Sequence, residues 1–248
     1  MNLRYLILSI VVSGQSMCAQ APTQFFSSAW GEEFKLMRND SGDTISIGGL
    51  FATAGSLYVY DMAEGRIVVI DSSGNIVTRI MLESFGRGTY AGDDFVVRDD
   101  EILFLNTVDK RLEVYDRETG AHTQSLPYPR NIFDTEQRRI RRTITKIFID
   151  GNRIILGNSY HFFYFDEALG KKAKNTTVQS IEPGMRLMSI NAAGKIGVGG
   201  GKVIAAGKVI GPVPVSHFPV DGKRLVFLND TVYSLVLTAD SVKIMQVR

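Results

Sequence analysis

The chain offers few residues suited to nucleophilic or acid–base chemistry. It has one cysteine, Cys18, and three histidines, His122, His161 and His217, which are far apart and show no metal-ligand spacing. A single thiol excludes an internal disulfide, a CxxC redox pair and a multi-thiolate metal site. The sequence contains neither a Gly-x-Ser-x-Gly elbow nor a His-Glu-x-x-His motif. It therefore predicts no catalytic residue, no metal ligand and no cofactor.

Carboxylates are more abundant, and a pair of them is one way to build an acid–base site. The candidates are Asp61, Asp93, Asp94, Asp99 and Asp100. The adjacent pair at 99 and 100 reads as a turn, and Asp61 ends an apolar run. Both have simpler structural uses, so we predict no catalytic pair here.

Two short segments resemble fragments of calcium loops. Residues 39–43 read Asn-Asp-Ser-Gly-Asp, and residues 71–75 read Asp-Ser-Ser-Gly-Asn. An EF-hand needs oxygen ligands at alternate positions over about twelve residues and a terminal Glu, which neither segment supplies. We interpret both as hairpin turns, in which Asp or Asn accepts backbone hydrogen bonds and Gly adopts a positive φ.

Residues 127–143 form an insert that contains the strongest concentration of positive charge. Good helix formers follow a predicted N-cap at Asp134, which indicates a short helix or a long loop. The insert carries four arginines, Arg138, Arg139, Arg141 and Arg142. They are either a solvated face or a docking site for a carboxylate, a phosphate, an acidic polysaccharide or a protein partner.

The elements that must position these residues are short strands. After Pro22 the sequence consists of apolar runs, rich in Val, Ile, Leu, Phe and Tyr, separated by Gly, Asn and Asp. This pattern is typical of antiparallel strands joined by tight turns. A composition of 44% hydrophobic and 22% charged residues agrees with a globular all-β domain.

The strands repeat. Residues 57–71 align with residues 102–116 at a constant offset of 45, and weaker copies continue to the C-terminus. Self-similarity at this period, with about four strands per unit, predicts a β-propeller. Five units are visible between residues 49 and 248, so we expect a single propeller domain over 22–248 with five or six blades. The strand pair within residues 25–47 either completes the last blade or belongs to a sixth.

These residues also resemble a known repeat. The motif Arg66-Ile67-Val68-Val69-Ile70-Asp71, its Gly74 turn and the following Phe85-Gly86-Arg87-Gly88 are similar to an NHL-type propeller repeat. The resemblance is clearest over residues 50–126. Together with the N-terminal signal pattern described below, the repeat makes the chain similar to exported six-bladed bacterial propellers. The resemblance implies a fold more than an activity.

The glycine-rich segment 85–92 does not open a helix after a strand, so it is not a phosphate-binding loop. In a propeller it would join the outer strand of one blade to the inner strand of the next, at one mouth of the central channel. Arg87 and Tyr90 are therefore candidate ligand contacts. The other glycine-rich segment, 197–201, is interpreted as a bend or bulge at a strand end.

The N-terminus has the features of a secretory signal peptide over residues 1–21. Arg4 precedes a short apolar run, and Ala19-Gln20-Ala21 provides small residues for cleavage. Gln15-Ser16-Met17 before Cys18 fits a lipidation motif poorly. The sequence therefore predicts a periplasmic, outer-membrane-associated or extracellular protein.

Charge is unevenly distributed along the chain. Residues 22–129 contain 9 Lys or Arg and 17 Asp or Glu, whereas residues 130–248 contain 18 Lys or Arg and 9 Asp or Glu. In a ring this makes one half acidic and the other basic, which steers charged partners. The overall net charge of +2 argues against nucleic acid as a partner.

We therefore expect an exported, non-catalytic binding or scaffold propeller that engages a protein or a cell-surface glycan through loops on one face. A resemblance to propeller lactonases and lyases provides the alternative, with Ca²⁺ or Zn²⁺ held in the channel by acidic or His residues of inner strands. A third possibility is a carbohydrate-binding accessory of an outer-membrane uptake system.

Overall fold

The computed structural model describes most of the predicted domain. The described residues are 21–38, 44–45, 47–83, 92–128, 144–158, 162–168, 170–177, 186–191, 194–205, 208–216, 224–228 and 231–247. Four predictions fall outside them: residues 1–20 of the signal peptide, the turn at 39–43, the glycine-rich loop at 84–91 and the insert at 129–143. Among the described residues, no helix is long and apolar enough to cross a membrane.

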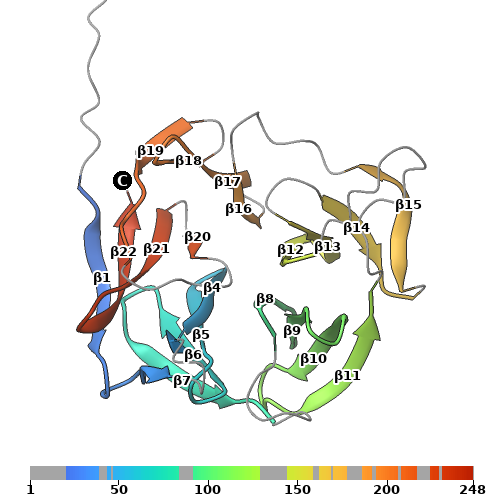
Figure 1. Cartoon of the computed structure of the whole chain (residues 1–248), viewed down its shortest axis with the longest axis horizontal. Coiled ribbons are helices and arrows are strands. Elements are labelled where there is room, and N and C mark those ends of the chain that lie inside the picture. Colours follow the sequence, from blue (N-terminus) through green and yellow to red (C-terminus); the bar gives the residue numbers. More distant parts are fainter. Residues whose placement is uncertain are drawn as a thin grey trace, which may run out of the picture.

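The described strands form five four-stranded antiparallel sheets arranged as a five-bladed β-propeller (Figure 1). The all-β prediction is confirmed, and of the two predicted blade numbers the structure has five. Blade 1 consists of β4 (Ile47–Thr53), β5 (Ser56–Asp61), β6 (Arg66–Asp71) and β7 (Ile76–Met81). Blade 2 consists of β8 (Asp94–Arg98), β9 (Glu101–Asn106), β10 (Arg111–Asp116) and β11 (His122–Pro127).

The other three blades follow in chain order. Blade 3 consists of β12 (Lys146–Asp150), β13 (Arg153–Gly157), β14 (Phe162–Asp166) and β15 (Lys171–Thr177). Blade 4 consists of β16 (Arg186–Asn191), β17 (Gly194–Gly199), β18 (Lys202–Ala205) and β19 (Lys208–Pro212). Blade 5 consists of β20 (Leu225–Leu228), β21 (Thr231–Leu237), β22 (Ser241–Val247) and β1 (Thr23–Ala29).

Each blade runs from an inner strand beside the central axis to an outer strand at the rim. Figure 1 shows β4, β8, β12, β16 and β20 around the centre. The prediction that residues 197–201 form a bend is confirmed, because Gly200 and Gly201 have φ values of +56° and +73° in the turn between β17 and β18.

The ring is closed by strands from opposite ends of the chain. β1 pairs antiparallel with β22, from Thr23 opposite Gln246 to Ala29 opposite Ser241. The Trp30 indole donates a hydrogen bond to the Thr238 carbonyl at 2.9 Å. The N-terminal segment thus completes the last blade, one of the two predicted alternatives, but it does so through Thr23–Ala29 and not through the predicted strand pair at 34–37 and 44–47. Residues 37–38 and 44–45 pair as the short strands β2 (Met37–Arg38) and β3 (Thr44–Ile45).

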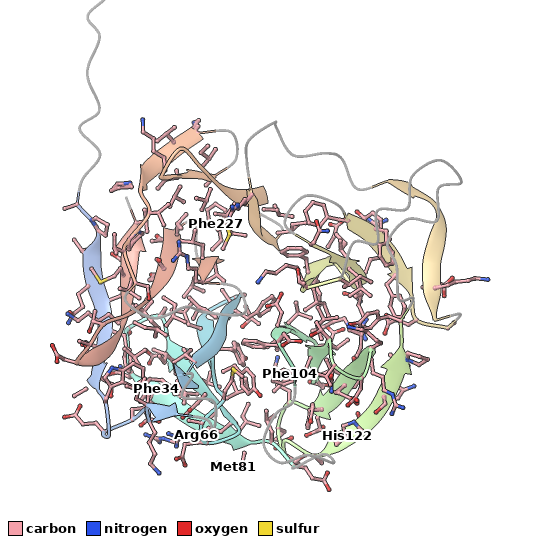
Figure 2. All side chains as sticks on the ribbon, in the orientation of Figure 1. Phe34, Arg66, Met81, Phe104, His122 and Phe227 are labelled. Atoms are coloured by element: carbon pink, nitrogen blue, oxygen red, sulfur yellow. The ribbon has the colours of Figure 1, made fainter. Side chains whose placement is uncertain are left out.

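Apolar side chains from facing sheets fill the spaces between blades. Between blades 1 and 2, the ring of Tyr60 lies edge-on to Phe104 at 4.7 Å between centroids, and Phe95 stacks on Phe104 at 5.5 Å. Figure 2 labels Phe104 at this junction and Phe227 between blades 4 and 5. Because each sheet is apolar on both faces, neighbouring blades must cover one another.

A buried carboxylate joins blades 2 and 3 at their inner strands. Asp94 is fully buried. One of its oxygens accepts from the Phe95 backbone N–H at 3.0 Å, and the other accepts from the Ile147 N–H on β12 at 3.1 Å. Asp94 is therefore a structural residue that ties one inner strand to the next.

Replacing this carboxylate should weaken the ring. In Asp94→Ala the buried Ile147 N–H loses a partner, so the free energy of unfolding should fall by about 1–3 kcal/mol. Urea unfolding measures the change. Asp99→Asn is the control, because Asp99 is exposed at φ 48° and Asn tolerates this backbone conformation. Equal stability of the two variants would contradict the role given to Asp94.

An ion-pair network holds the segment after β1 against blade 1. Glu33 accepts two hydrogen bonds from Arg79, at 2.8 and 2.6 Å, and lies 3.4 Å from Arg66. Arg66 also pairs with the buried Asp61 at 3.0 Å. Figure 2 shows Arg66 near Phe34, at the edge of the core. The network thus connects the ring-closing segment to β6 and β7.

Asp61 makes the stability of this junction dependent on pH. Burial raises the pKa of Asp61 from 3.8 to about 6, and its bond with Arg66 opposes the shift only in part. The folded chain therefore holds this proton more tightly than the unfolded chain. The resulting stability is complete below the unfolded pKa and is lost as pH rises through the folded one.

In Asp61→Asn the side chain no longer titrates. The variant should therefore lose less stability than the unmodified chain as pH rises from about 4 to about 7. Urea midpoints measured across this range test the expectation, with exposed Asp240→Asn as the control. Parallel pH profiles for the unmodified chain and Asp61→Asn would contradict it.

Candidate functional site

The predicted contact residues are not among those the structure places. Arg87 and Tyr90, and the four arginines Arg138, Arg139, Arg141 and Arg142, lie outside the described residues. The same is true of His161 and His217.

Most candidate carboxylates have structural roles. Asp61 and Asp94 are buried and bonded as described above, and Asp93 accepts from the Thr107 N–H at 2.9 Å. Asp99 occupies the turn between β8 and β9 with φ 48°. The prediction of structural uses for Asp61 and for the turn is confirmed. Asp100 lines both grooves described below, and Asp99 lines the second of them.

The segment at 71–75 is a hairpin turn, as predicted. The Asp71 carboxylate accepts from the backbone N–H groups of Ser73 and Asn75 at 2.8 and 2.9 Å. Gly74 adopts φ +88°. These hydrogen bonds lower the pKa of Asp71 and account for its side chain.

The channel site implied by the lactonase resemblance does not fit the described inner strands. Their carboxylates are Asp94, which holds two backbone N–H groups, and Asp150, which pairs with Arg153 at 2.7 Å. In the part of the chain that the structure describes, no group of three His, Cys, Asp or Glu side chains is arranged to hold a metal.

One cluster brings together the residue types of a hydrolytic triad. The Nε2 atom of His122 lies 3.0 Å from Glu113 and 3.4 Å from the hydroxyl of Ser125, which also bonds Glu113. A triad requires the carboxylate and the hydroxyl on opposite ring nitrogens. Here both contact the same nitrogen, and the ring packs edge-on against Tyr115 at 5.2 Å between centroids. His122 is thus a packing residue of β11.

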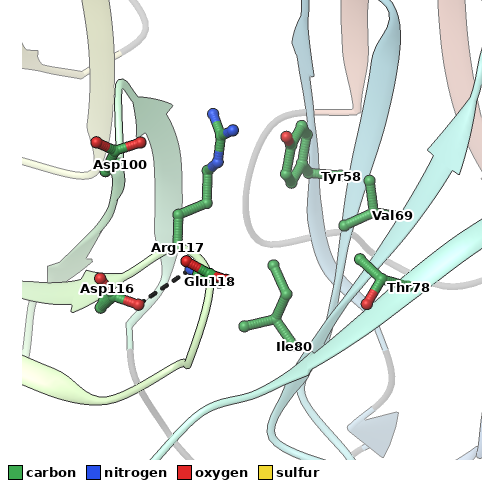
Figure 3. A pocket seen from close by; sticks show the side chains of 8 residues that line it. All are labelled: Tyr58, Val69, Thr78, Ile80, Asp100, Asp116, Arg117 and Glu118. Carbon is green, nitrogen blue, oxygen red and sulfur yellow. Dashed lines mark hydrogen bonds between the residues drawn. The ribbon is translucent and has the colours of Figure 1, made fainter.

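The candidate site is a groove of about 500 Å³ between blades 1 and 2 (Figure 3). Its floor is the face of blade 1 formed by Tyr58, Val69, Thr78 and Ile80. Tyr58 and Val69, and Val69 and Thr78, are cross-strand partners, so these side chains share one face. The volume is within the range of known ligand pockets, about 300–1,000 Å³.

The opposite wall is made by two turns of blade 2. It consists of Asp100, between β8 and β9, of Asp116 at the end of β10, and of Arg117 and Glu118 in the turn that leads to β11. Figure 3 shows Arg117 extended between Asp100 and Tyr58. Strands from one blade and turns from the next thus create an apolar floor beside a charged wall.

The wall is fixed by its own hydrogen bonds. Asp116 accepts from the Thr119 hydroxyl and N–H, both at 2.7 Å, and from the Glu118 N–H at 3.1 Å. These bonds hold the pKa of Asp116 below its ordinary value, so it is ionised at neutral pH. Arg117 donates to the Asp99 carbonyl at 2.7 Å.

A second, smaller groove of about 380 Å³ lies on the other side of Asp100. Its Arg98 pairs with Glu101 at 2.6 Å and with Glu167 of blade 3 at 2.7 Å. These carboxylates raise the pKa of the guanidinium. Because its cation is already paired twice, this groove has less to offer a ligand than the first.

The described lining of the first groove offers a ligand an apolar surface beside three carboxylates and one guanidinium. In the sequence Asp100 was interpreted only as part of a turn, and the floor residues were not predicted, because they read as ordinary strand residues of another repeat. The sequence signal that could have pointed to this groove is the excess of acidic residues between 47 and 128, where there are 13 Asp or Glu and 7 Lys or Arg.

Gly120 sets how closely the wall approaches the floor. It has φ +74°, and a Cβ atom there would lie 1.9 Å from the Met81 carbonyl oxygen of β7. Its own carbonyl accepts from the Glu83 N–H at 2.8 Å. Only glycine allows this turn to rest on the outer strand of blade 1.

Gly120→Ala should therefore lower the melting temperature more than Gly55→Ala. Both positions have positive φ, which costs about 1 kcal/mol for a side chain. A Cβ at Gly55 meets no atom within 4 Å, so the control carries the backbone cost alone. Equal losses in the two variants would show that the turn does not press on β7.

Comparisons with known proteins give no family for this chain. No family model matches it, and no curated protein matches it in sequence. Similar solved structures include glutaminyl cyclase of Myxococcus xanthus (12% identity, 81% of this chain and 72% of that chain, TM-score 0.37). Another is BamB from Moraxella catarrhalis (13% identity, 79% of this chain and 71% of that chain, TM-score 0.34). A third is the Pan2 WD40 domain of Neurospora crassa (12% identity, 86% of this chain and 62% of that chain, TM-score 0.37). Similarity at these levels carries no argument about function, and the propeller assignment rests on the strand order.

Proposed function

We propose that this chain is an exported, non-catalytic propeller that binds a protein partner, with NHL-like blades as its scaffold. The groove between blades 1 and 2 carries the proposal. It combines an apolar floor, in which Tyr58, Val69 and Ile80 are each 6% exposed, with charged groups at its wall. Protein-binding sites commonly have such an apolar centre and a polar rim.

The residues suggested by the sequence are secondary contacts in this proposal. Arg87 and Tyr90 are assigned to the partner at the channel mouth. Arg138, Arg139, Arg141 and Arg142 are assigned to an anionic surface, on the partner or on a neighbouring glycan. The N-terminal signal pattern supports a location in the cell envelope or outside the cell.

The test is capture of a partner followed by titration of the purified pair. Thr78 is exposed and lines the groove. Thr78→Trp fills the groove and should weaken binding by at least about tenfold, equivalent to about 1.4 kcal/mol. Val209→Trp is the matched control, since Val209 is 59% exposed on the outer strand of blade 4.

A captured protein whose affinity is the same for both variants would overturn the groove as the binding site. A bait with the four arginines replaced by Ser reports separately on the insert. If only that bait loses its partner, the binding function stands and the site moves to the insert.

A further inference from the structure

The floor of the groove ends at an open strand edge. In the described part of the chain, β7 pairs with β6 on one side and with no strand on the other. Edge strands present backbone groups that can pair with another chain. Beside this edge Val77 and Met81 are 62% and 57% exposed, and the charge of Arg79 is occupied by Glu33. The edge therefore lacks the free charge that usually discourages pairing.

The edge and the groove are geometrically linked. Along β7, Thr78 and Ile80 face the groove, and Arg79 and Met81 face the opposite side, because side chains alternate along a strand. A strand added to this edge would alternate in the same way, so every second side chain would lie over the groove. The Gly120 turn rests on Met81 and Ile80 at the end of β7, and Val77 and Thr78 before them are exposed.

The wall that these side chains would meet is acidic. Among the described residues, the carboxylates of Asp100 and Glu118 have no ion-pair partner, and Asp116 is ionised. Arg117 is the cation of the lining and is bonded to a backbone carbonyl. The lining thus carries three negative charges and one positive charge, in the half of the ring where acidic residues predominate.

We propose that the groove and the β7 edge bind an extended segment of the partner that carries Lys or Arg at alternate positions. Its backbone pairs with β7, as in other cases of strand addition. The aliphatic part of each basic side chain lies on Val69 and Ile80, and its charged head approaches Asp100 and Glu118. This inference rests on the proposed function and names the chemistry of the partner.

The experiment uses three capped, labelled pentapeptides with Val at the odd positions and Lys, Gln or Glu at the even ones. They are titrated by fluorescence anisotropy against the chain, against Asp100→Asn/Glu118→Gln, and against the matched control Glu32→Gln/Asp240→Asn. The control removes two exposed charges from blade 5 and the segment that follows β1.

The Lys peptide should bind at least about fivefold more tightly than the Gln peptide, and the Glu peptide should bind least. The groove variant should remove this preference, the control should keep it, and about 0.5 M salt should weaken it. Amide signals of β7 should shift on binding.

Other results would overturn the inference in distinguishable ways. Equal binding of all three peptides at β7 would remove the basic preference but keep strand addition. Equal affinity for free spermidine and the Lys peptide would assign the groove to a small cation. If no peptide binds while Thr78→Trp still releases the captured partner, the proposed function stands and this occupant is wrong. If Thr78→Trp has no effect either, both fail.

Discussion

The structure depends on one constraint: each four-stranded sheet is apolar on both faces, and only the neighbouring blades can remove those faces from water. A ring satisfies this condition when its first and last blades meet. The pairing of β1 with β22 fixes that closure, since it joins strands from opposite ends of the chain. The Glu33 pairs with Arg66 and Arg79 then carry the closing segment across to blade 1. Blade packing and ring closure therefore depend on one another.

The same constraint decides where chemistry can occur. Inner strands are buried, so polar side chains on them must be satisfied internally, as Asp94 is by two backbone N–H groups. Farther out in blade 2, the buried Glu113 of β10 lies 3.0 Å from His122 Nε2 and accepts a hydrogen bond from the Ser125 hydroxyl. Groups available to a ligand are left to turns and rims. The groove arises because turns of blade 2 reach over the outer part of blade 1, where the aromatic core between the blades ends.

Much of the fold could be predicted because strand alternation and tight turns are local signals. The inner strand β4 is hard to recognise in the sequence, since Gly48 and Gly49 interrupt its apolar run. The outer strand β15 is also hard to recognise, because Lys171–Thr177 has no apolar alternation and its pairing with β14 is decided by the blade. The blade number depends on how strongly successive sheets rotate, which no single repeat encodes. The groove joins Tyr58 to Glu118, whose proximity follows only from ring geometry.

Charge connects the sequence pattern to the site. An excess of acidic residues in one half of a sequence usually has no spatial meaning, but consecutive repeats of a propeller are neighbours in the ring, so the excess becomes a local field over blades 1 and 2. Much of it is consumed by structure, as with Asp61, Asp71 and Asp94. What remains is concentrated in the turns that form the groove wall. Since an apolar floor supplies little discrimination, the residual negative charge is the feature that selects among extended segments, and it favours basic ones.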